Sequence, residues 1–170
     1  MLLNATRQNL HQLSSLLHQL SDDDFTSKLE ILSQSSIGMH MRHIIEFYQC
    51  LLAATETGIL NYDSRKRNKL LETNREFCQE TIEKIMLQAE DLKPQQLLQL
   101  QCDYALTTKE KDSVAIKTSV LRELQYNLEH SVHHMAIIRI GINTLNNPIE
   151  IASDFGVAAS TIRNKKACAQ

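Results

Sequence analysis

Two histidines in the last third of the chain have the spacing of metal ligands. His130 and His134 are four residues apart in the segment HSVHH. On a helix, this spacing places both imidazoles on one face, one turn apart. Their ring nitrogens can then reach a single cation at about 2.0–2.1 Å. A third nitrogen from a facing helix would complete a three-histidine site with open positions for water or substrate, which is typical of catalytic metals.

A second histidine cluster offers candidates for the third ligand. His40 and His43 lie near the start of another apolar segment. Glu123 and Asn127 lie within two turns before His130, on its face, where they can accept a hydrogen bond from an imidazole N–H. Neutral imidazole suits Zn, Ni, Fe or Cu, and the sequence does not rank these metals. No glutamate follows His130, so the peptidase motif H-E-x-x-H is absent.

These histidines also have a purely structural interpretation. A pair four residues apart on a helix is frequent by chance and need not bind a metal. Two features favour a metal here: the pair lies in an apolar stretch, where unpartnered polar groups are costly, and a second cluster lies in another apolar helix. His11 and His18 stand beside glutamines and are interpreted as solvated surface residues.

Four segments with helical periodicity are expected to position the histidines. The second begins near Ser36, a good N-cap, and stops at Gly58. The third opens with a capping box at residues 73–76, and a polar turn at residues 21–24 ends the first. The four expected helices cover residues 3–20, 36–57, 73–92 and 119–145.

The expected architecture is all-α. Four amphipathic helices indicate a four-helix bundle, with a short β-hairpin or extended excursion at residues 97–118 between the third and fourth helices. Residues 61–72 are expected to form a loop, and residues 149–170 a tail. The chain has 170 residues, the usual size of one domain, and we expect a single domain over 1–170. Only 4 glycines and 2 prolines occur, which disfavours a β-sandwich or barrel.

Charge and cysteine content limit the partners. The chain has 18 Lys and Arg against 20 Asp and Glu, so it lacks the basic surface that nucleic-acid binding needs. No apolar run approaches the roughly 20 residues that span a bilayer, and the N-terminus does not resemble a signal peptide. Four cysteines without a C-x-x-C pair are interpreted as reduced, buried packing residues. We therefore expect a cytoplasmic protein that binds neither membranes nor nucleic acid.

Four segments, in order, resemble the DinB-like superfamily. They are SIGMHMRH (36–43), YDSRKR (62–67), RELQYNLEHSVHH (122–134) and FGVAASTIR (155–163). The first matches the S-I-G-x-H-x-R-H form of this superfamily. The resemblance covers most of the chain, and the joint occurrence of the four segments is more specific than any one of them.

The resemblance implies a helical bundle with a divalent metal on three histidines. The second-helix ligand usually follows a serine by seven positions, which places it at His43, and the H-x-x-x-H matches His130 and His134. His40 is the alternative, either lining the pocket or replacing His43. The tail is expected to pack on or near the metal site. The chain departs from the pattern at three positions, Phe47 (often His), Ala159 (usually Pro) and Asn164 (commonly His), which puts additional ligands there in doubt.

The resemblance also implies candidate activities. Relatives include metal-dependent thiol transferases, a maleylpyruvate isomerase-like branch and many proposed hydrolases. We expect one zinc or nickel ion per chain as Lewis acid, a low-molecular-weight thiol as a candidate cofactor, and a homodimer. His40 or Glu123 would orient a ligand or move protons, and Arg65 or Arg67 would anchor an anionic substrate. The alternative is a non-catalytic metal-binding or stress-response protein.

Overall fold

The computed structural model describes residues 1–107 and 112–168, apart from the side chain of residue 166, and is largely helical. The helices are α1 (Leu2–Gln19), α2 (Asp22–Thr26), a 3-10 turn (Glu30–Leu32), α3 (Ile37–Thr57), α4 (Leu70–Thr73), α5 (Arg75–Ala89), α6 (Val120–Ile142) and α7 (Ala159–Cys168). The strands are β1 (Ile59–Leu60), β2 (Leu97–Asp103) and β3 (Ser113–Ser119). Among the described helices, none has the length and hydropathy that crossing a membrane requires.

The two helices that carry the histidine clusters begin and end at specific cap residues. The Ser36 hydroxyl accepts a hydrogen bond from the Met39 N–H at 3.1 Å and starts α3. Gly58 ends α3 with φ +77°, a conformation that glycine adopts without strain. Ser119 caps α6 through the Arg122 N–H. The expected start and end of α3 and the expected start of α6 are confirmed, whereas α6 ends at Ile142 and not at residue 145.

Three other element boundaries, set by local polar side chains, differ from those expected from the sequence. The cap of α5 is Asn74, which accepts the Phe77 N–H, so the expected capping box over residues 73–76 is wrong. The polar stretch 21–24 begins the short helix α2, with Ser21 and Asp24 forming a reciprocal capping box, and is therefore more than a turn. The expected loop at 61–72 ends in the single-turn helix α4.

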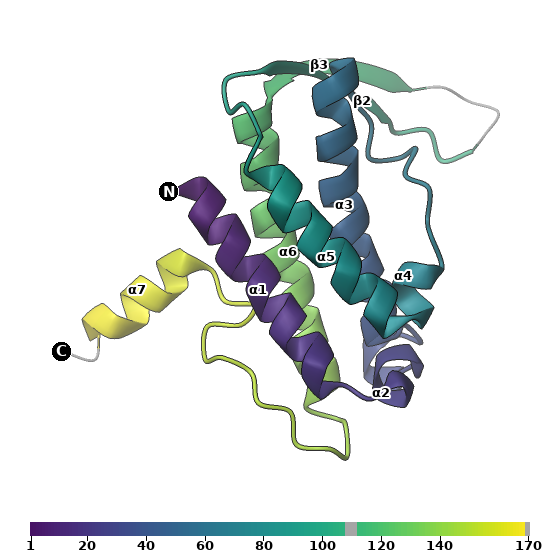
Figure 1. Ribbon diagram of the computed structural model, residues 1–170, viewed down its shortest axis with the longest axis vertical. Coiled ribbons are helices and arrows are strands. Elements are labelled where there is room, and N and C mark those ends of the chain that lie inside the picture. The colour runs from purple at the N-terminus through teal and green to yellow at the C-terminus, as the bar shows by residue number, and fades with distance from the viewer. Residues whose placement is uncertain (108–111, 169–170) are drawn as a thin grey trace.

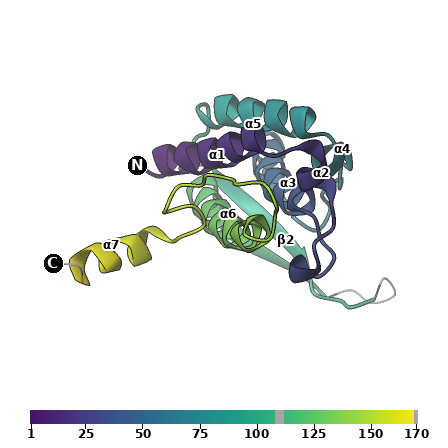
Figure 2. The same cartoon turned by 90° about the horizontal axis from the view of Figure 1, so that it is seen from below.

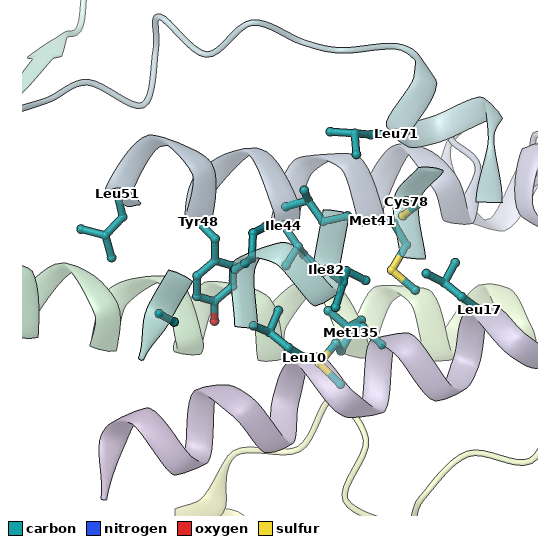
Figure 3. Close-up of a cluster of buried hydrophobic side chains, with 14 of the residues drawn as sticks. Leu10, Leu17, Met41, Ile44, Tyr48, Leu51, Leu71, Cys78, Ile82 and Met135 are labelled. Atoms are coloured by element: carbon teal, nitrogen blue, oxygen red, sulfur yellow. The ribbon is translucent and has the colours of Figure 1, made fainter. Parts of the chain in front are cut away.

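Four long helices enclose the core. α3 lies beside α5 and α6, and α1 lies beside the same two helices. Figures 1 and 2 show α1 and α5 on one side of the molecule and α3 and α6 on the other. The labelled side chains of Figure 3, among them Leu10, Met41, Ile44, Tyr48 and Met135, meet between these helices and are almost wholly buried. Each of the leucine, isoleucine and methionine side chains among them contributes about 1.5–3 kcal/mol by leaving water. This packing fixes α3 against α6.

A three-stranded sheet lies at the end of α3. Its order is β1-β2-β3, with β1 parallel to β2 and β3 antiparallel to β2. The expected hairpin at 97–118 is confirmed in its described strands, while residues 108–111 lie outside the described part. Leu60 and Leu98 are buried and attach the sheet to the core. β1 was not expected, because a two-residue strand has too little alternation to be recognised.

The tail packs away from the histidines. The Gln19 side chain exchanges hydrogen bonds with the backbone of Glu150, and Arg139 donates to the Ala152 carbonyl. Phe155 is buried, and Gly156 lies against the backbone of Ala136. Ala136 and Arg139 follow His134 by two and five residues, which at about 3.6 residues per turn places them on the far side of α6. The described contacts of the tail are thus with α1 and with the side of α6 opposite His134. α7 projects from the body (Figures 1 and 2), and residues 169–170 lie outside the description.

The cysteines differ in their environments. All four are free thiols. Cys78 is buried, Cys50 and Cys102 are partly buried, and Cys168 is exposed. The expectation of four buried packing residues is therefore correct for Cys78 only.

Candidate metal site

The contact between α3 and α6 brings three expected ligands together. One nitrogen from each of His43, His130 and His134 lies within 4.8 Å of the other two. His43 Nε2 and His130 Nε2 are 2.8 Å apart. The ring centroids lie 5.0 Å apart for His43 and His130, 4.4 Å for His43 and His134, and 4.7 Å for His130 and His134. The two histidines spaced four residues apart on α6 and the histidine on α3 thus meet at one position.

The donor set fits a divalent transition metal. Two ligands held at about 2.0–2.1 Å from one cation are about 3 Å apart, close to the His43–His130 separation. The group contains three imidazoles and no carboxylate, and all three residues are partly buried. Zinc, nickel and copper prefer such nitrogen donors, whereas magnesium and calcium prefer oxygen. Three protein ligands leave room for an exogenous one.

The imidazoles are held in the neutral form that binds metals. Burial lowers the pKa of His134 to about 3, with His43 and His130 as further causes. Burial, followed by the charges of His130 and Arg65, lowers the pKa of His43 to about 4. Burial also lowers the pKa of His130. At neutral pH the three nitrogens therefore need to release few protons to accept a metal.

His40 lies beside the three histidines and outside the group they form. Its Nδ1 is 3.0 Å from Nδ1 of His134, so that one of these nitrogens donates to the other. Its Nε2 is buried and has no hydrogen-bond partner in the described structure. His133 is exposed and meets His134 edge-on, with ring centroids 5.8 Å apart. The geometry therefore favours His43 as the α3 ligand and places His40 against His134.

Glu123 and Asn127 contact a tyrosine. Glu123 is buried and accepts hydrogen bonds from the Tyr62 hydroxyl at 3.0 Å and from the Thr118 hydroxyl at 2.7 Å. The Asn127 amide donates to the same Tyr62 hydroxyl at 3.2 Å. Burial and the Glu123 charge raise the pKa of Tyr62, so this hydroxyl stays protonated and donates. In this structure the two residues hold Tyr62, whereas the sequence suggested that they accept from an imidazole.

An aromatic wall closes one side of the histidine group. The Phe47 ring lies 4.6 Å from each of the His43, His130 and Tyr62 rings, and Tyr126 stacks on His130 at 5.6 Å. In the sequence, Phe47 is a departure from the family pattern and Tyr62 belongs to the expected loop at 61–72. Neither residue could be recognised from its spacing in the sequence, because the rings that meet here come from α3, α6 and the loop after β1.

The structure distinguishes the candidate arginines. Arg65 lies over the Phe47 ring, with its guanidinium carbon 5.6 Å from the ring centre, and its Nε is 3.5 Å from Glu46 Oε2. Arg67 is exposed and has φ +50°. Arg42 pairs with Glu72 and, at 3.9 Å, with Glu46, and thus makes structural ion pairs. Of the two expected anion anchors, Arg65 contacts a ring that touches the histidines, whereas Arg67 is exposed.

A hollow borders the site at Arg65. It has a volume of about 1060 Å³ and is lined by residues that include Glu46, Cys50, Glu56, Arg65, Lys66 and Asp91. The three histidines are absent from its lining. Burial raises the pKa of the Cys50 thiol, so this cysteine is a poor nucleophile there.

Comparisons with protein-family models, with curated proteins and with solved structures found no match for the chain. The interpretation of the site therefore depends on its geometry and on the sequence resemblance described above.

Proposed function

We propose that the chain is a DinB-like metalloprotein, built on a four-helix bundle, that binds one zinc or nickel ion through His43, His130 and His134. We propose that it acts as a metal-dependent hydrolase or thiol S-transferase. The observation that carries this proposal is the convergence of three neutral imidazoles from two adjacent helices within 4.8 Å. The sequence resemblance supports the choice of family and of reaction class.

Each part of the site has a defined task in this proposal. A bound divalent metal would supply Lewis acidity, which lowers the pKa of a coordinated water or thiol towards neutrality. His43, His130 and His134 hold the metal, and His40 orients the His134 ring through the contact at 3.0 Å. Phe47 excludes water from one side. Glu123 acts through Tyr62, which it holds against the aromatic wall.

Elemental analysis of purified protein tests the metal site. We expect about one metal ion per wild-type chain and almost none in a His130→Ala/His134→Ala double variant, because two of three ligands are lost. A His11→Ala/His18→Ala double variant is the matched control, since both residues are exposed on α1. Equal metal content in the wild type and the His130/His134 variant would refute the site.

A non-catalytic role is the competing proposal. The hollow beside Arg65 is not lined by the three ligands, which favours a metal that only stabilises the fold. Chelation separates the two functions. Loss of hydrolytic or thiol-conjugating turnover, with recovery on adding zinc or nickel, supports an enzyme. A fall in melting temperature, in a protein without turnover in either state, supports the structural role.

A further inference from the structure

The strand β3 is an edge strand, and its outer side meets no other strand in the described part of the chain. The sheet order is β1-β2-β3, so β3 pairs with β2 alone. Its residues from Ser113 to Lys117 are exposed, and Figure 1 shows the sheet at one end of the molecule. Proteins protect such edges with very short strands or with proline, but β3 has seven residues and no proline. The edge can therefore accept another strand.

Hydrogen bonds at both ends of the hairpin show which backbone groups of β3 point outward. The Tyr104 N–H donates to the Asp112 carbonyl at 3.1 Å, and the Val120 N–H donates to the Gln96 carbonyl at 2.9 Å. Along an antiparallel ladder, residue pairs that exchange hydrogen bonds alternate with pairs that do not. The even-numbered residues of β3 therefore direct their backbone groups towards β2. The odd-numbered exposed residues direct theirs to the open side, and these are Ser113, Ala115 and Lys117.

A second copy of β3 can pair with this edge in an antiparallel register centred on Ala115. Two identical antiparallel strands related by a two-fold axis place residues of the same face opposite each other. In this register, the outward groups of Ser113 meet those of Lys117 in the second copy, and the two Ala115 residues meet each other. Pairing is confined to exposed residues and ends before Val120, where α6 begins.

This register matches apolar side chains on one face of the sheet. Val114 and Ile116 are 42% and 44% exposed, and they come opposite Ile116 and Val114 of the second copy. Cross-strand pairs of such β-branched side chains stabilise sheets. Within each chain, Val114 and Ile116 already lie opposite Cys102 and Leu100 of β2. The pairing therefore extends an existing row of apolar side chains from one copy into the other.

On the opposite face, the same register brings together complementary charges. Lys117 comes opposite Ser113 of the second copy, and Ser113 lies opposite Asp103 within each chain. The Ser113 hydroxyl donates to the Asp103 carboxylate at 3.2 Å, so the carboxylate lies on this face. Neighbouring strands are about 4.8 Å apart, and only the short serine side chain lies between the lysine of one copy and the aspartate of the other. Two such pairs form, one on each side of the two-fold axis.

We propose that β3 pairs antiparallel with β3 of a second copy of this chain, which joins the two sheets into one sheet of six strands. This surface differs from the helix faces that the family resemblance implies. The inference does not depend on the metal site, so its failure would leave the proposed function unaffected.

Sedimentation equilibrium at micromolar concentration tests the role of the edge. Ala115→Pro removes an outward N–H and leaves the hydrogen bonds to β2 in place, because the Ala115 backbone groups face the open side. We expect a dimeric wild type and dimerisation of Ala115→Pro that is weaker by about tenfold or more, because two hydrogen bonds at the axis are lost. Ala115→Val keeps the N–H, and this matched control should dimerise like the wild type.

A charge reversal tests the lysine–aspartate pairs. Lys117→Glu places a negative charge near Asp103 of the second copy, so it should weaken the dimer, and added salt should reduce this effect. Lys28→Glu makes the same change of net charge at an exposed residue just after α2, at the opposite end of the molecule from the sheet (Figure 1). It should leave dimerisation unchanged. Equal effects of the two reversals would contradict the charge pairing.

A cysteine cross-link tests the register. Ala115→Cys is made in a Cys168→Ser background, which removes the exposed native thiol. In a hydrogen-bonded antiparallel pair, the two Cα atoms are about 5.5 Å apart, a separation that a disulfide spans. Mild oxidation should therefore cross-link the two copies. Ser113→Cys in the same background is the control, because its two copies would be about 14 Å apart and should not cross-link.

Each outcome supports the inference or overturns it. A wild type that is monomeric at micromolar concentration refutes the pairing. An Ala115→Pro protein that dimerises as tightly as the wild type also refutes it and moves the contact to another surface, such as α6. If Ala115→Pro does not fold, the cysteine variants decide. The pairing is then wrong if Ala115→Cys does not cross-link, or if it cross-links no better than Ser113→Cys.

Discussion

At the scale of single residues, the site consists of three converging imidazoles and the side chains that hold them. The spacing of His130 and His134 was visible in the sequence because a helix repeats every 3.6 residues. The resemblance pointed to His43, and the structure places it with them. Tyr62 and Phe47 were not recognisable as a wall, because contacts between a loop, α3 and α6 leave no periodic signal.

His40 is predicted to tune metal affinity without being a ligand. Its nitrogen lies 3.0 Å from His134, so His40→Ala should weaken metal binding about 10–100-fold while one metal per chain still binds. Isothermal titration with zinc measures both quantities. His133→Ala, which removes the exposed neighbour, should leave the affinity unchanged. Complete loss of metal from His40→Ala, with metal retained by His43→Ala, would make His40 the ligand.

The histidine group also predicts how the stability of the metal-free protein depends on pH. His43 and His134 have pKa values of about 4 and 3 in the fold, below the ordinary value of 6.5. The unfolded chain therefore binds more protons once pH falls below about 6.5, and this favours unfolding. Their contribution to stability is complete above pH 6.5 and is lost progressively down to about pH 3–4.

Thermal unfolding followed by circular dichroism at pH 7.5 and pH 5 measures this effect. Between these two pH values, the melting temperature of the metal-free wild type should fall further than that of His130→Ala/His134→Ala. The variant lacks His134, whose pKa is strongly lowered, and His130 beside it. Each 1 kcal/mol corresponds to about 2–4 °C for a chain of this size. An equal loss in the two proteins would show that the imidazoles are not buried as described.

At the scale of elements, helix ends could be predicted from the sequence where a capping residue marks them. Ser36, Gly58 and Ser119 mark helix ends by side-chain or backbone chemistry that needs no tertiary partner, and the structure agrees. α4 and β1 are short, so their formation depends on packing against distant residues, whereas α2 has a local signal in the capping box of Ser21 and Asp24. The course of the tail likewise depends on contacts with α1 and α6 that no local pattern encodes.

Gly156 is predicted to be essential for docking the tail. It has φ +66°, and an added Cβ would lie 2.4 Å from the Ala136 nitrogen. Gly58 has a similar φ of +77° with open space around it, so Gly58→Ala isolates the cost of the backbone conformation, about 1–2 kcal/mol. Gly156→Ala should destabilise the protein clearly more in urea unfolding, and limited proteolysis should cut within 149–158 sooner. Equal destabilisation by the two changes would contradict this packing.

At the scale of the whole molecule, we propose a homodimer. The resemblance implies buried helix faces between subunits, and α6 exposes large apolar side chains at Leu121, Tyr126 and Ile140. Burying such side chains between two copies would remove apolar surface from water. Sedimentation equilibrium should therefore give twice the chain mass of 19.4 kDa. A single species at the chain mass over the micromolar range would contradict the dimer.

Metal binding is predicted to stabilise the whole fold, because the ligands come from two helices. α3 and α6 contribute His43 on one side and His130 and His134 on the other, so a cation that joins them binds the folded chain and not the unfolded one. At a free metal concentration 100 times the dissociation constant, the gain is about 2.7 kcal/mol. With a conversion of about 2–4 °C per kcal/mol, the melting temperature should rise by about 5–10 °C. Differential scanning calorimetry with zinc or nickel should show this rise for the wild type and for His11→Ala/His18→Ala. The rise should disappear in His130→Ala/His134→Ala, and its persistence there would mean that the stabilising metal binds elsewhere.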